Sequence, residues 1–128
     1  MKRYRFERWQ NLIVVQAAVE GEHDLTVARL LVDTGSAQTM LSWQTLQAVG
    51  HDPAASRERR QISTVATTIT VPQVRMRRSH CLGKVVENFP VLCHTPPFAT
   101  GIHGLLGMDF LRAFDIAIHV RQGYIEVE

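Results

Sequence analysis

The sequence predicts a single all-β domain, a closed barrel or a sandwich of short strands, with one or two short helices. Three observations predict this class. Short runs rich in valine, isoleucine and threonine recur along the chain, and turn-forming residues separate them at close spacing. Helical spacing of apolar residues occurs in only two short segments. The length of 128 residues fits one domain with its own core.

The first elements are expected to be two paired strands. Residues 12–19 and 25–32 are apolar and β-branched, and the polar segment 20–24 between them predicts a hairpin loop. A brief third strand is expected at residues 39–41.

A short helix should follow this strand. Ser42 is a suitable N-cap residue, with Thr45 at the third helical position. Leu46 and Val49 would face inward, and Gly50 would end the helix.

The middle of the chain predicts a loop and then a hairpin. Residues 51–60 are polar and contain a proline, which favours a loop. Residues 62–71 are dense in threonine, valine and isoleucine, as strands prefer. The small and polar centre of this run places the hairpin tip at Ala66, Thr67 and Thr68.

The last third predicts four more strands, one loop and one helix. Asp109 lies favourably in the first turn of that helix. The strands are expected at residues 74–82, 85–92, 115–120 and 124–127, the loop at 95–101 and the helix at 109–114.

Composition excludes several classes of protein. Hydrophobic residues make up 45% and charged residues 20%, as in a globular and not a disordered chain. No run approaches the roughly 18 apolar residues that a membrane-spanning helix needs. The first 22 residues lack the unbroken apolar stretch and the cleavage site of a secretory signal. We therefore expect a cytoplasmic protein, or a soluble domain of a longer anchored precursor.

Two arginine clusters accompany a net charge of +2. Nucleic-acid grooves usually interleave aromatic residues with basic ones, and neither cluster contains an aromatic residue. We expect solvated strand or loop faces, and keep a nucleic-acid-binding β-barrel as a third functional hypothesis. The clustered arginines are Arg57, Arg59, Arg60, Arg75, Arg77 and Arg78.

The two cysteines, Cys81 and Cys93, each have a histidine neighbour, which invites a zinc hypothesis. The close pairing of ligands that structural zinc sites use is absent, however. The expected turn at residues 83–84 would not place the cysteines opposite each other. Free thiols are favoured over a disulfide, and a disulfide over a metal site.

The chemically informative segment is Asp33-Thr34-Gly35-Ser36, directly after three large apolar residues. A carboxylate at the end of a buried strand is costly unless its charge is partnered or its pKa is shifted. Gly35 allows a sharp turn and a close backbone approach. Taken alone, the tetrapeptide is equally consistent with an ordinary turn.

A second motif lies far downstream. Leu105-Leu106-Gly107 is an apolar pair closed by glycine, and residues 108–111 begin a helix. With both motifs in this order, the chain resembles the retropepsin-like aspartic proteases, single-domain relatives of retroviral protease, and in particular their bacterial and retroelement branch. The resemblance spans residues 11–127.

The resemblance implies a closed β-barrel-like fold in which Asp-Thr-Gly ends an inner strand and a later apolar strand threads beside it. It implies that Asp33 is catalytic and that Thr34, Gly35 and Ser36 support it. The implied psi-loop residues are Leu105, Leu106 and Gly107.

The implied reaction is peptide-bond hydrolysis by two carboxylates that share one proton. None of the other aspartates, at positions 24, 52, 109 and 115, is followed by Thr-Gly or Ser-Gly, so one chain carries one half-site. The expected enzyme is a homodimeric endopeptidase in which Asp33 faces the partner's Asp33. It would act on a peptide or protein substrate and need no metal or organic cofactor.

Ser36 bears on the expected pH dependence. A Ser36 hydroxyl that donates to the charged carboxylate would lower the pKa values of the pair and favour an acidic optimum. The alternative is that Ser36 only packs locally.

The resemblance also implies a flap at residues 63–71, a hairpin over the substrate whose tip usually carries glycine. Thr67 stands where glycine is expected, and a β-branched residue resists positive φ. This departure motivates a runner-up function, a catalytically weak or inactive dimerisation or peptide-binding module. Val65, Ile69 and Leu105 are the apolar candidates for lining substrate pockets. The flap and substrate residues are Val65, Ala66, Thr67, Thr68 and Ile69.

The termini can be interpreted in two ways. Residues 4–9 and 124–127 alternate in a manner that suits strands shared between two copies of the chain. They suit plain edge strands equally well.

Overall fold

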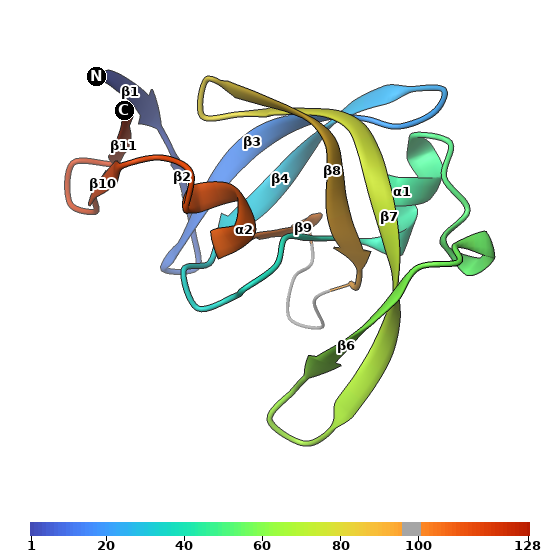
Figure 1. The fold of residues 1–128 in the computed structure, drawn as a ribbon. Coiled ribbons are helices and arrows are strands. Elements are labelled where there is room, and N and C mark those ends of the chain that lie inside the picture. The colour runs from blue at the N-terminus through green and yellow to red at the C-terminus, as the bar shows by residue number, and fades with distance from the viewer. Residues whose placement is uncertain (96–100) are drawn as a thin grey trace.

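A computed structural model describes residues 1–95 and 101–128. It contains eleven strands and three short helical segments, shown in Figure 1. In chain order these are β1 (Lys2–Arg5), β2 (Glu7–Trp9), β3 (Leu12–Glu20), β4 (Leu25–Val32), β5 (Met40–Leu41), α1 (Trp43–Ala48), the 3₁₀ turn η1 (Pro53–Ala55), β6 (Arg59–Ser63), β7 (Thr68–Cys81), β8 (Lys84–Cys93), β9 (Gly104–Leu106), α2 (Met108–Leu111), β10 (Ile116–His119) and β11 (Tyr124–Val127).

Eight strands form one sheet whose pairing closes into a ring. The order is β2-β3-β4-β9-β5-β8-β7-β6, and β3 also pairs with β7, so β3, β4, β9, β5, β8 and β7 make the strand ring. Alternating apolar residues of these strands fill its interior, where Leu30, Leu41 and Met76 are fully buried. The predicted all-β class with two short α-helices is confirmed.

The first helix begins and ends close to the predicted residues. Ser42 is its N-cap, and the Ser42 hydroxyl accepts from the Thr45 amide at 3.2 Å. The chain leaves the helix through Gly50 at a φ of +93°, a conformation that favours glycine. The second helix differs more, since α2 covers Met108–Leu111 whereas 109–114 was expected.

The hairpin of β6 and β7 extends beyond the strand ring (Figure 1). Its tip lies at residues 64–67, because Ser63 pairs with Thr68, so the tip predicted at residues 66–68 began two residues and ended one residue too late. The described residues with positive φ include none in this tip, so Thr67 is not forced into a conformation that it resists.

The two ends of the chain meet in a separate three-stranded sheet of order β1-β11-β10, on the left in Figure 1. Strand β11 is central and pairs with β1 and β10 of the same chain. In the structure the terminal strands are thus paired within one chain, with β1 and β10 at the two edges.

Both cysteines are free and buried. The turn between β7 and β8 is at Leu82 and Gly83, one residue earlier than expected, since Cys81 pairs with Lys84. Burial raises the pKa of Cys81 to about 12 and that of Cys93 to about 11.

The six clustered arginines are all exposed, as expected for solvated faces. Arg77 and Arg78 each lie 3.9 Å from a Glu20 oxygen, and Arg75 lies 3.5 Å from Glu58. Among residues 1–95 and 101–128 we find no helix with the length and apolarity required to span a membrane. Most of the loop expected at 95–101 lies outside the described residues.

Candidate active site

Asp33 directly follows strand β4 and lies at the end of the strand ring. Leu30 faces the main core, and Leu31 faces the opposite side, as does Asp33 two residues later. Strand β9 runs parallel to β4, with Leu31 opposite Leu105. The Asp33 amide continues this pairing by donating to the Leu106 carbonyl at 3.0 Å. The structure thereby brings together two sequence motifs that are far apart in the chain.

The backbone after Asp33 turns back towards its carboxylate. The Gly35 amide donates to Asp33 Oδ1 at 2.9 Å, and the Ser36 amide donates to the Asp33 carbonyl at 3.2 Å. The Asp33 side chain is half-buried, whereas Thr34 and Gly35 are exposed. The carboxylate therefore has one backbone donor and lies beside exposed main chain.

Of the two roles that the sequence leaves open for Ser36, the structure favours local packing over a bond to the carboxylate. Its hydroxyl donates to the Gln38 carbonyl at 2.8 Å, two residues along the same loop. Short-range acceptors of this kind compete well for serine hydroxyls in turns. Ser36 supports the loop through this bond and through its main chain.

Gly107 allows the loop and the helix α2 to lie against each other. A Cβ at this position would come within 2.6 Å of the Gln38 carbonyl carbon, closer than real Cβ atoms approach. The close approach lets the first turn of α2 donate its free amides to the loop: Met108 to the Ser36 carbonyl at 2.8 Å and Asp109 to the Ala37 carbonyl at 3.2 Å.

Asp109 is the residue whose role sequence reasoning missed. Its carboxylate accepts from the Thr39 amide at 3.0 Å and from the Thr39 hydroxyl at 2.7 Å, across 70 residues of chain. The hydroxyl of Thr39 in turn accepts from the Gly107 amide at 3.1 Å. The sequence indicated only an acidic residue in a first helical turn, and nothing in it pairs Asp109 with the buried Thr39.

An apolar surface lies on the same face of β4 as Asp33. Val14, Leu31 and Ile102 are buried there as a cluster separate from the main core. Trp9, Leu12 and Leu105 pack against this cluster and are only partly buried. Leu105, which was expected to line a pocket, therefore belongs to a half-exposed apolar wall.

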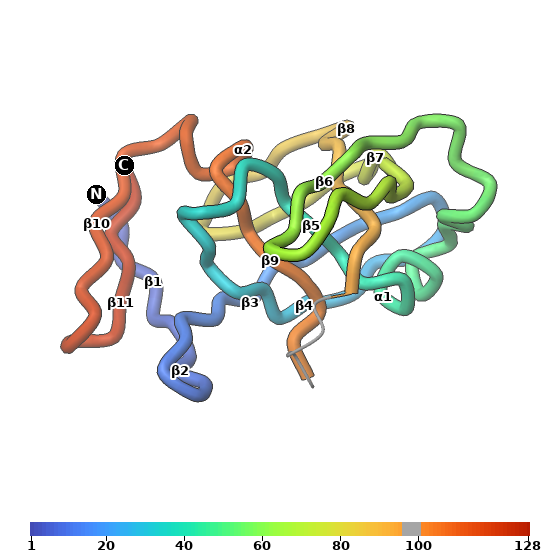
Figure 2. The backbone as a smooth tube through the Cα atoms, turned by 90° about the horizontal axis from the view of Figure 1, so that it is seen from below, coloured from blue at the N-terminus to red at the C-terminus, as the bar shows by residue number. Residues whose placement is uncertain are grey.

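The β6–β7 hairpin lies at the same end of the strand ring as the Asp33 loop, as Figures 1 and 2 show from two directions. Val65 at its tip is fully exposed, and Ala66, Thr67 and Thr68 are exposed. Ile69 is half-buried opposite Ile62. The structure thus places the predicted flap residues on a projecting hairpin.

The Asp33 carboxylate of a single chain can take or give a proton, but it cannot do both in the same step. The other carboxylate next to this loop, Asp109, is occupied by Thr39. The described part of the chain holds no group of three or more His, Cys, Asp or Glu side chains that could bind a metal ion. A single chain therefore presents one acid–base group beside an exposed turn and an apolar wall.

Comparison with known proteins agrees with this arrangement. A family model described as "Aspartyl protease" matches residues 15–110, three quarters of the chain. The solved structures that match include a retropepsin-like aspartic protease from Rickettsia conorii, with a TM-score of 0.75 and 18% identity, over 98% of this chain and 89% of that chain. No curated protein matches. The fold is retropepsin-like, and the chain belongs to the aspartyl protease family.

Proposed function

We propose that this protein is an aspartic endopeptidase whose active form is a homodimer with an Asp33 from each chain. The observation that carries the proposal is the placement of Asp33: a half-buried carboxylate at a strand end, held by the Gly35 amide, with Thr34 and Gly35 exposed beside it. Exposed main chain next to the carboxylate is where a second copy has to approach for two carboxylates to share a proton.

The proposed reaction needs only the two carboxylates and water. One Asp33 is ionised and takes a proton from water as the water oxygen attacks the carbonyl carbon of the substrate. The partner's Asp33 is protonated and donates its proton to the carbonyl oxygen. The first Asp33, now protonated, then donates its proton to the amide nitrogen as the C–N bond breaks, and the partner's Asp33, now ionised, takes a proton from a hydroxyl of the intermediate. This step leaves an amine and a carboxylic acid and restores both side chains. Sharing one proton between two close carboxylates is the general property of aspartic proteases.

The apolar wall and the hairpin supply the substrate contacts in this proposal. Leu105, the partly exposed residue of this wall beside β4, would contact apolar substrate side chains next to the scissile bond, and the buried Leu31 and Ile102 would support it from beneath. The hairpin would close over the substrate backbone. Its tip forms without positive φ, so the threonine in place of glycine is no argument against turnover. The alternative of an inactive binding module then rests on the stiffness of the tip, and the test below decides between the two.

The test is cleavage of a diverse peptide pool between about pH 3 and pH 8. Wild type is compared with Asp33→Asn, which keeps the shape and removes the acid, and with Asp24→Asn, an exposed aspartate as the matched control. We expect wild type and Asp24→Asn to cut and Asp33→Asn to lose at least about a thousandfold in rate. A stable dimer that cuts nothing, or equal cleavage by Asp33→Asn, contradicts the proposal.

A further inference from the structure

The tip of the β6–β7 hairpin is stiff, so any motion of the hairpin has to occur at its root, where it joins the strand ring. Thr64 and Thr67 close the tip with three hydrogen bonds: Thr64 amide to Thr67 carbonyl at 2.7 Å, Thr64 hydroxyl to the same carbonyl at 2.9 Å, and Thr67 amide to Thr64 hydroxyl at 3.1 Å. No glycine occurs between Gly50 and Gly83 in the sequence. The tip therefore has no glycine at which the hairpin could bend.

The root is the point where β7 changes neighbours. Residues 68–72 of β7 pair with β6, and the last of these pairs joins Pro72 to Arg59. From Gln73 onwards β7 pairs with β8 as part of the strand ring, beginning with Gln73 opposite Leu92. Gln73 is therefore the first residue of the ring and the neighbour of the last residue of the hairpin.

Every polar group of Gln73 has a partner, although the residue is only 5% exposed. Its amide N–H donates to the Glu58 carbonyl at 2.9 Å, and its carbonyl accepts from the Ser56 hydroxyl at 2.5 Å. Its side-chain nitrogen donates to Glu58 Oε2 at 2.5 Å, and its side-chain oxygen accepts from Arg60 Nε at 3.0 Å. Three bonds thus tie β7 to the segment that leads into β6, and the fourth ties it to Arg60 in β6 itself.

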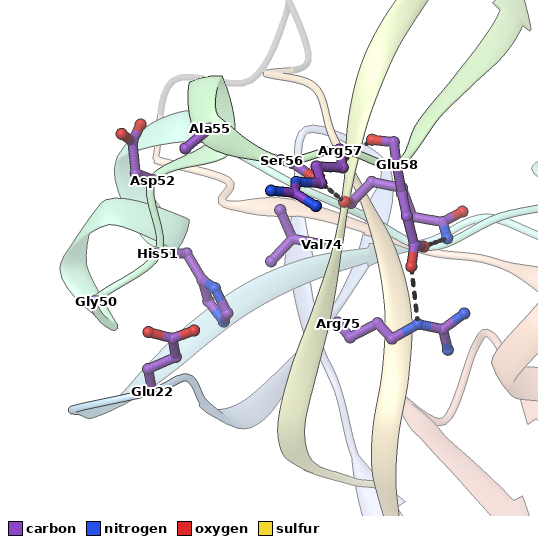
Figure 3. A pocket seen from close by; sticks show the side chains of 11 residues that line it. Glu22, Gly50, His51, Asp52, Ala55, Ser56, Arg57, Glu58, Val74 and Arg75 are labelled. Atoms are coloured by element: carbon purple, nitrogen blue, oxygen red, sulfur yellow. Dashed lines mark hydrogen bonds and ion pairs between the residues drawn. The ribbon is translucent and has the colours of Figure 1, made fainter.

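The segment tied by Gln73 has little other support on one side. A hollow of about 510 Å³ borders it, lined among others by Ser56, Glu58 and Gln73. Figure 3 shows this hollow, with a dashed line that joins Glu58 to Arg75, whose atoms lie 3.5 Å apart. The Glu58 and Arg75 side chains are about half exposed, so packing holds them weakly. Hydrogen bonds to Gln73 are the specific restraint at this place.

We infer that Gln73 is a positioning residue: its side-chain amide, through Glu58 and Arg60, fixes the angle at which the β6–β7 hairpin leaves the strand ring and so the closure of the hairpin over a bound peptide. The role of the hairpin in peptide binding rests on the proposed function. The restraint on the hairpin does not, because it follows from the contacts of one chain.

The experiment is hydrogen exchange of the hairpin amides in Gln73→Met, which keeps the size of the side chain and deletes its amide. We expect amides of residues 59–71 to exchange about tenfold faster, with unchanged exchange in β3 and β4. Gln61→Met is the matched control, since Gln61 is an exposed glutamine of the same hairpin. Unchanged hairpin exchange, an equal effect of Gln61→Met, or faster exchange throughout the strand ring would overturn the inference.

A swap of the two partners covers the case in which Gln73→Met folds poorly. Gln73→Glu alone places two carboxylates at hydrogen-bond distance and should loosen the hairpin at neutral pH. The pair Glu58→Gln and Gln73→Glu restores an amide donor opposite a carboxylate, with Arg60 still facing an oxygen. We expect the pair to recover the exchange rates of wild type, and failure to recover them counts against the inference.

Cleavage gives a second, separable readout. We expect Gln73→Met to raise KM about fivefold and to change kcat by less than about twofold, because the hairpin contacts bound peptide and not the reacting atoms. Loss of kcat at constant KM contradicts this assignment. If wild type cleaves nothing, the proposed function fails, while the exchange measurements still decide the role of Gln73.

Discussion

The Asp33 loop and the β6–β7 hairpin leave the strand ring at the same end, yet they are held in opposite ways (Figures 1 and 2). The loop at residues 33–39 is fixed by β9 and α2, with partners such as Asp109 that lie 70 residues away from Thr39. The hairpin is fixed by its own ladder and by Glu58, 15 residues away from Gln73. Thr39 is buried, whereas the hairpin tip is exposed.

The difference between the loop and the hairpin matches the different roles proposed for them. A carboxylate that has to meet a second carboxylate needs a fixed place, and long-range contacts to a packed helix provide it. A segment that admits and covers a substrate needs lower local stability, and few buried contacts provide that. Damage to the loop should therefore reach the whole domain, whereas damage to the hairpin should stay local.

The largest effect is expected for Gly107→Ala. The new Cβ would lie 2.6 Å from backbone of the loop, so α2 and the loop have to separate. We expect a loss of about 3 kcal/mol in the free energy of unfolding, measured in urea. Ala66→Gly at the hairpin tip is the contrasting change and should cost less than about 0.5 kcal/mol. Equal costs would remove the distinction between the two regions.

Asp109→Ala should come next. It removes the acceptor of the Thr39 amide and hydroxyl, which become buried donors without a partner. We expect a loss of about 2 kcal/mol in the free energy of unfolding, and about half of that for Asp109→Asn, which keeps one acceptor oxygen. Asp115→Ala, at an exposed aspartate, is the control in the same urea titration. A cost for Asp109→Ala no greater than that of the control would show that the loop is held by packing alone.

Alkaline pH should weaken the strand ring through Cys81. Its pKa is about 12 in the folded chain against a reference of 9.0, so the unfolded chain loses its proton first as the pH rises. The free energy of unfolding should fall above pH 9 by up to about 1.4 kcal/mol per pH unit. Cys81→Ala should show a shallower slope between pH 9 and pH 11 by urea unfolding. Identical slopes would mean that the thiol titrates freely in the folded chain.

Thr64→Val should have the smallest effect and the most local one. It removes the hydroxyl that joins Thr64 to Thr67 on both sides of the tip. We expect a cost of less than about 1 kcal/mol in the free energy of unfolding. The Thr67 amide should exchange faster, and the exchange of the strand-ring amides should not change. Thr70→Val, at an exposed position of the same hairpin, serves as control. Faster exchange in the Asp33 loop would show that the two regions are coupled.

Local chemistry made much of the fold predictable from the sequence. Ser42 and Gly50 bound the first helix because their backbone preferences act within a few residues. The hairpin tip was predicted one to two residues too late, because several small or polar residues between Ser63 and Thr68 suit a turn. The sequence did not decide whether the terminal strands pair within one chain or between two, since an edge strand accepts a partner from either chain.

In the candidate site, too, the residues with local signals were predictable and those with distant partners were not. Asp33 and Gly35 became candidates only when their local signal, a carboxylate after a buried strand and a glycine turn, was combined with the later motif at residues 105–107. The sequence left two roles open for Ser36, because a rotating hydroxyl chooses between nearby acceptors, and the bond to the Gln38 carbonyl favours local packing. The role of Asp109 was missed because its partner, Thr39, is near in space and far in sequence.

The long-range support of the Asp33 loop also sets the order in which the domain assembles. Pairing β4 with β9 joins residues such as Arg29 and His103, 74 positions apart, and closing so long a loop is slow. During synthesis, Asp33 emerges well before the residues of β9 and α2 that fix it. We expect the β6–β7 hairpin to form early and the Asp33 loop to become ordered last, so that an incompletely synthesised chain carries the aspartate without a positioned site.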